Sequence, residues 1–122
     1  MSESRLHAIR GAISVPEDTS EAIRAATAQL LGEVLGRNGL TAEDLVSIIF
    51  TSTADLVSDF PAVAAREMGL SEVPLLCTRE IPVTGSLPRC VRVLAHCYPP
   101  PGVEVRHVYL GEARQLRMDL PE

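Results

Sequence analysis

Arginine and glutamate side chains stand at the inner ends of two apolar stretches in the second half of this sequence. The first stretch, Val73–Cys77, leads into Glu80, and the second, Cys90–Tyr98, carries Arg92 among residues that favour burial. A guanidinium removed from water is strongly unfavourable unless an anion pairs with it. The partner of Arg92 is therefore either a protein carboxylate, such as Glu80, or a carboxylate of a ligand.

The basic residues restrict the possible reaction mechanisms, because all eleven are arginines and the sequence contains no lysine. Schiff-base formation, P-loop phosphate binding and lysine general bases are therefore excluded. Arginine stays protonated, so it supplies fixed charge and forked hydrogen-bond donors rather than proton transfer. A site built from these residues would bind and stabilise anions.

Other candidate chemistry is weaker. The histidines lack a serine or aspartate at a spacing typical of a catalytic triad, and the cysteines lack metal-ligand spacing and are interpreted as buried thiols. These residues are His7, His96 and His107, and Cys77, Cys90 and Cys97. Taken alone, Arg10 and Glu80 are most simply structural, whereas for Arg92 a functional role and a structural ion pair stay equally open.

Composition predicts a single domain over residues 1–122, with room for one core in 122 residues of 46% hydrophobic content. The net charge of −5 and the scattered arginines argue against nucleic-acid binding. No apolar run approaches the length of a membrane span, and the first eleven residues lack the apolar core of a signal peptide, so we expect a cytoplasmic protein.

Two helices and five strands are expected to position these residues. Leu6–Val15 alternates as a strand that places Arg10 on its smaller, more polar face. A capping box at Asp18–Glu21 opens an amphipathic helix that ends at Asn38 and Gly39, and a second helix runs from Pro61 to Met68. The other strands are Leu45–Thr51, Val73–Cys77, Cys90–Tyr98 and Val103–Leu110.

The last strand is predicted to form a long hairpin with the strand before it, around the Pro-Pro-Pro-Gly turn that ends at Gly102. Residues from about 111 to 122 are expected to be a charged, flexible tail. The order predicts an α+β fold, a mixed five-stranded sheet with the two main helices on one face. The other face needs a cover, and oligomerisation would supply it.

Four segments together resemble the AroH class of monofunctional chorismate mutases, in order and at matching spacing over nearly the whole chain. They are IRGAISV at 9–15, TADLVSDFPAVAAREMG at 53–69, VPLLCTREIPVTGSLPRCVRV at 73–93 and RHVYLGEARQLRMDL at 106–120. The resemblance implies a homotrimer whose sheets form a pseudo-α/β-barrel, with active sites between subunits. It also implies conversion of chorismate to prephenate in phenylalanine and tyrosine biosynthesis, without cofactor or metal.

The same resemblance implies roles for individual residues. Arg10 would bind a substrate carboxylate, Arg92 would reach the breaking ether oxygen, and Glu80 would hydrogen-bond the ring hydroxyl. Further substrate contacts are implied for Cys77 and Tyr109, for Phe60 and Arg66 from the adjacent subunit, and for Leu116 and Arg117 in the tail.

Two positions depart from the family pattern: Val63 stands where a lysine often occurs and Leu76 where a threonine occurs. Both departures bear on substrate affinity rather than on the reaction. The alternative function is a non-catalytic trimeric module that binds a small carboxylate metabolite.

Overall fold

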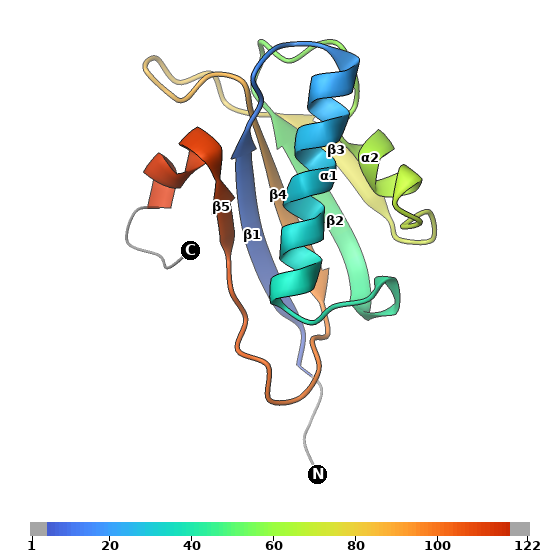
Figure 1. The fold of residues 1–122 in the computed structure, drawn as a ribbon. Helices are drawn as coiled ribbons and strands as arrows, with labels where there is room; N and C mark the ends of the chain where they lie inside the picture. Colours follow the sequence, from blue (N-terminus) through green and yellow to red (C-terminus); the bar gives the residue numbers. More distant parts are fainter. Residues whose placement is uncertain (1–4, 118–122) are drawn as a thin grey trace.

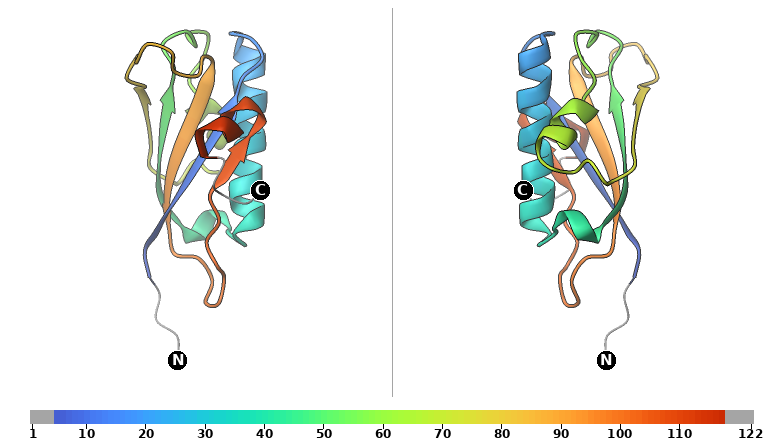
Figure 2. Two further views of the ribbon diagram at one scale, coloured as in Figure 1. Left: turned by 90° about the vertical axis from the view of Figure 1, so that its left-hand side faces the viewer. Right: turned by 90° about the vertical axis from the view of Figure 1, so that its right-hand side faces the viewer.

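A mixed five-stranded sheet with two α-helices on one face makes up the computed structural model, which describes residues 5–117 (Figures 1 and 2). The elements are β1 (His7–Ser14), α1 (Ser20–Arg37), the 3-10 helix η1 (Ala42–Asp44), β2 (Leu45–Ser52), α2 (Ala62–Glu67), β3 (Leu75–Arg79), β4 (Cys90–Cys97), β5 (Val108–Leu110) and the 3-10 helix η2 (Gly111–Arg117). The predicted fold class is confirmed. None of the helices in residues 5–117 has the length and apolar character that crossing a membrane requires.

The strand order is β3-β2-β4-β1-β5, with β4 antiparallel to both β1 and β2, and with β3 and β5 each parallel to its neighbour. The predicted hairpin between the last two strands is therefore wrong. Both edges of β4 are already occupied by β1 and β2, so the chain crosses over and adds β5 beside β1. The strand is also short, because the side chain of Asn38 binds the backbone N–H and C=O of Arg106.

Helix α1 begins one residue later than the capping box predicted. Thr19 is the N-cap, and its hydroxyl accepts a hydrogen bond from the Ala22 N–H at 3.1 Å. The Asp18 carboxylate instead accepts the N–H groups of Val57 and Ser58. The segment just before α1 is thus tied to the loop between β2 and α2.

The main core lies between the helices and the sheet. Strand residues Ile9, Ile48, Phe50 and Val91 are at most 1% exposed and meet the apolar side of α1. Side chains alternate along each strand, so the neighbours of these residues point to the opposite face, which neither α1 nor α2 covers in Figure 2. This second face, called the open face below, carries the exposed side chain of Leu76.

A smaller cluster of buried residues lies at the β5 side of the open face, where η2 packs. Ala12, Cys90 and Ala113 form its centre, and Leu87, Tyr109 and Leu116 pack against it. Ala113 is fully buried. Residues 111–117 therefore form a packed 3-10 helix instead of part of the charged, flexible tail that the sequence predicted, whereas residues 118–122 lie outside the described part of the chain.

Candidate active site

Arg92 meets a protein carboxylate on the open face. Its Nε lies 3.4 Å from Oε2 of Glu80, which follows β3 and is fixed there by a backbone hydrogen bond to the Ser52 carbonyl. The Thr51 hydroxyl donates to the same carboxylate oxygen. The side chain of Arg92 keeps 44% of its surface exposed, so the guanidinium remains accessible to a ligand beside Glu80.

The sheet register explains this meeting. Thr51 pairs with Arg92, Arg92 pairs with Ala12, and Ala12 pairs with Tyr109, so these four residues form one row across β2, β4, β1 and β5. Directly paired residues point to the same face of a sheet. Tyr109 therefore lies on the open face as well, one strand beyond β1.

A hollow of about 250 Å³ on the open face gathers three of the predicted site residues: Arg10, Glu80 and Arg92. Arg10 pairs with Leu94 and belongs to the row beside that of Arg92. Two arginines and one glutamate leave an excess positive charge over a partly apolar floor that includes Ile49 and Leu94. Such a site can bind an anion and stabilise developing negative charge, and its fixed cations need no proton transfer.

The residues predicted from the C-terminal segment lie at the β5 side of this face. Tyr109 and Leu116 both pack against the cluster around Ala12 and Cys90. Burial, the largest cause, raises the pKa of the Cys90 thiol, while nearby Arg92 acts in the opposite direction. Arg117 ends η2, and burial, followed by the charges of Arg10 and then Arg117, lowers the pKa of His107, the residue before β5.

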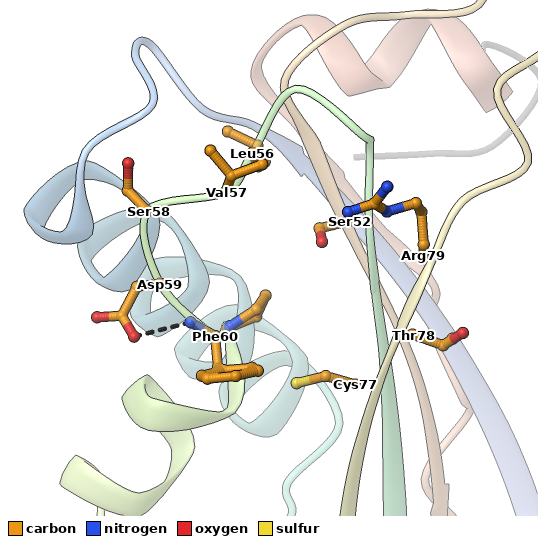
Figure 3. A pocket seen from close by; sticks show the side chains of 10 residues that line it. Ser52, Leu56, Val57, Ser58, Asp59, Phe60, Cys77, Thr78 and Arg79 are labelled. Atoms are coloured by element: carbon orange, nitrogen blue, oxygen red, sulfur yellow. Dashed lines mark hydrogen bonds between the residues drawn. The ribbon is translucent and has the colours of Figure 1, made fainter.

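A second and larger hollow, of about 440 Å³, contains Cys77 and Phe60 (Figure 3). The sulfur of Cys77 is directed toward the Phe60 ring in this view, and Phe60 is 68% exposed. Cys77 pairs with the buried Phe50, so its side chain points to the helix side of the sheet. Within one chain the sheet therefore separates Cys77 from Arg92, although the resemblance implies that both residues contact the substrate.

The loop that carries Phe60 is held by the first turns of α1. The Asp59 carboxylate accepts the Phe60 N–H at 2.7 Å and the Ser20 hydroxyl at 2.5 Å, with Nε of Arg24 at 3.7 Å. The hydrogen bond from Ser20, followed by that from Phe60, lowers the pKa of Asp59. Arg66, the other residue predicted near Phe60, is exposed on α2 and does not line either hollow.

One contact of this site was not predicted from the sequence, namely that of Thr51 with Glu80. Alternation along β2 places Thr51 on the open face, but its meeting with Glu80 can be predicted only once the register between β2 and β3 is known. For metals, residues 5–117 contain no group of three or more His, Cys, Asp or Glu side chains placed to hold an ion.

Comparison with known proteins bears on this arrangement. The family model described as chorismate mutase type I matches residues 6–120. The chain is 57% identical over 114 residues to the chorismate mutase AroH of Thermus thermophilus, covering 92% of this chain and 93% of that one. It is 41% identical over 117 residues to the AroH of Bacillus subtilis, covering 94% and 92%. A solved chorismate mutase from Clostridium thermocellum superposes with a TM-score of 0.86 at 45% identity, covering 89% of this chain and 98% of that one.

Proposed function

This chain belongs to the chorismate mutase type I family, and from that premise we propose how its residues convert chorismate to prephenate. The enzyme is an isomerase of aromatic amino acid biosynthesis. In the rearrangement a C–O bond breaks ahead of C–C bond formation, so partial negative charge develops on the ether oxygen. The meeting of Arg10, Glu80 and Arg92 around one hollow carries the proposal.

Arg92 is the residue that stabilises the transition state. Its guanidinium is permanently charged and lies on a strand interior, where the sheet holds its backbone in place. A rate acceleration of ~10⁶ requires ~8 kcal/mol. Removing one preorganised donor typically costs ~3–4 kcal/mol, so Arg92 is the largest single contributor and conformer selection supplies the remainder.

Glu80 and Arg10 bind and orient the substrate. Glu80 accepts a hydrogen bond from the ring hydroxyl of chorismate and forms an ion pair with Arg92. The Thr51 hydroxyl donates to the Glu80 carboxylate and keeps it in position. Arg10 pairs with a substrate carboxylate, and Tyr109 lies near a carboxylate from its place on β5. Leu116 and Arg117 flank the site from η2. None of these roles requires a general base.

We further propose a homotrimer in which each active site lies between two chains. The hollow with Arg92 and the hollow with Cys77 and Phe60 lie on opposite sides of the sheet, so one chain cannot present both to the same substrate. A neighbouring chain supplies the second half, with Arg66 beside it. The exposed Leu76 on the open face, at 61%, supports a cover from another copy.

Loss of chorismate absorbance, followed without added metal or cofactor, tests the reaction. Arg92→Ala should lower kcat/KM by about 10²–10³-fold, because it removes the donor at the developing charge. Arg37→Ala is the matched control, since Arg37 forms an i,i+4 ion pair with Glu33 on α1. Unchanged turnover in Arg92→Ala would exclude the role given to that residue.

Mixing two impaired variants tests whether the site is shared between chains. Arg92→Ala damages one half and Phe60→Ala the other, so random reassembly should restore both intact halves at about one site in four. The assembly should have a mass of about 39 kDa by light scattering, three times 13.1 kDa. Activity no greater than the sum of the two separate variants, or a monomeric mass, would contradict the shared site.

A further inference from the structure

The ladder between β1 and β5 stops immediately beside Arg10. Gly11, Ala12 and Ile13 pair in parallel with Val108, Tyr109 and Leu110, but no backbone group of β5 reaches the N–H of Arg10. That N–H donates instead to Nδ1 of the His107 side chain, at 3.0 Å. A histidine ring thus replaces the next hydrogen bond of the ladder.

The segment before β5 explains why a side chain is needed there. The Asn38 amide donates to the Arg106 carbonyl at 2.9 Å, and its oxygen accepts the Arg106 N–H at 2.7 Å. Asn38 also donates to the Val34 carbonyl and is completely buried, so Arg106 is held against the end of α1. The backbone is therefore turned away from β1 at residue 106, and His107 bridges the gap through its ring.

This hydrogen bond determines the protonation of His107. A backbone N–H can only donate, so Nδ1 must be the acceptor, and the single ring proton resides on Nε2. Burial is the largest cause that lowers the pKa of His107, and the charges of Arg10 on β1 and Arg117 on η2 act in the same direction. More than half of the His107 rings are therefore neutral at pH 6.5, the ordinary pKa of histidine.

We propose that His107 is a positioning residue for Arg10, fixing through its neutral Nδ1 the backbone from which the Arg10 side chain enters the substrate hollow. This inference rests on the proposed role of Arg10 as a ligand of a substrate carboxylate. His107 itself does not line that hollow. Displacing a binding group by ~1 Å can reduce an enzyme's rate by ~10²-fold, so a hydrogen bond at this point affects catalysis without touching the substrate.

Two substitutions separate the acceptor from the ring. In His107→Asn the side-chain oxygen can accept the Arg10 N–H, whereas His107→Phe keeps a planar ring and removes the acceptor. We expect His107→Asn to keep kcat/KM within about threefold, and His107→Phe to lower it by about 10–100-fold, chiefly through KM. His7→Phe is the matched control, because it makes the same change on β1 three residues before Arg10.

A measurement on the resting enzyme tests the hydrogen bond without substrate. Nitrogen-15 NMR of the histidine rings should give an unprotonated Nδ1 and a protonated Nε2 for His107 at pH 7. The Arg10 amide resonance should shift when the ring becomes protonated in acid, and it should not titrate this way in His107→Asn. Unfolding measurements on each variant separate a loss of positioning from a loss of folded protein.

Three results decide the inference. Equal kcat/KM in His107→Asn and His107→Phe, with both folded, would overturn it, as would a protonated Nδ1 at pH 7. If the wild-type chain failed to consume chorismate, the proposed function and the catalytic part of this inference would both fail. The NMR result would still decide whether His107 holds the Arg10 backbone.

Discussion

Asn38 should be among the polar residues that matter most for stability, although it does not line the substrate hollow. It is fully buried, and its side chain makes three hydrogen bonds, two of 2.9 Å to the Val34 and Arg106 carbonyls and one of 2.7 Å from the Arg106 N–H. A hydrogen bond contributes about 0.5–1.5 kcal/mol net. Asn38→Ala should therefore lower the free energy of unfolding by about 2–4 kcal/mol, since it removes all three hydrogen bonds at once.

Urea unfolding at one fixed protein concentration measures this loss, because the stability of an oligomer depends on concentration. Thr27→Val is the control: Thr27 is also fully buried, but its hydroxyl donates only to the Ile23 carbonyl within α1. That variant should lose less than about 1 kcal/mol. Equal losses in the two variants, or a loss below about 0.5 kcal/mol in Asn38→Ala, would refute the reasoning.

Asn38→Asp extends the test to pH. A carboxylate at this place would face the two carbonyl oxygens that the amide now binds, so its pKa in the folded state should lie above its value in the unfolded state. A raised pKa means that the protonated form stabilises the fold at low pH. The variant should therefore be closest to wild type below about pH 4, and fall further behind as the pH rises toward 7.

Two further predictions concern the first residue of η2 and the loop that carries Phe60. Gly111 has φ of 60°, and a Cβ there would lie 2.5 Å from Oγ of Ser14, so Gly111→Ala should destabilise the fold by about 1–3 kcal/mol in urea unfolding. It should lose more than Gly85→Ala, where φ is 84° but the space is open, and equal losses would contradict the role of Ser14. The lowered pKa of Asp59 means that its charge stabilises the folded state above the ordinary value of 3.8, a contribution lost as pH falls through the folded-state pKa. The stability gap between wild type and Asp59→Asn should therefore shrink from pH 7 to pH 3, and a constant gap would argue against it.

Much of this fold was predictable because burial imposes periodicity on the sequence. Helical spacing in α1 and alternation in β1 correctly placed the core and the exposed Arg10. Alternation shows that a segment is a strand but not which strand it joins, and for this reason the partner of β5 was wrong. That choice depended on the occupied edges of β4 and on Asn38, 68 residues before Arg106.

The site was predictable in composition and less so in geometry. Arg10, Glu80 and Arg92 came together as the resemblance implied. The separation of Cys77 from Arg92 follows from alternation along β3. Cys77 and Thr78 are neighbours, so their side chains point to opposite faces, and Thr78 pairs with Thr51 on the open face. The contact of Thr51 with Glu80 needed the register across two strands, which no local pattern supplies.

The small cluster on the open face has a consequence for how this sequence can vary. Ala12, Cys90 and Ala113 come from three separate elements, and Leu87 and Leu116 pack against them from the loop before β4 and from η2. A larger residue at any of the three small central positions would push both segments outward at once. Substitutions at these positions should therefore be tolerated only in compensating sets that include the loop before β4 and η2, although more than twenty residues separate these two segments.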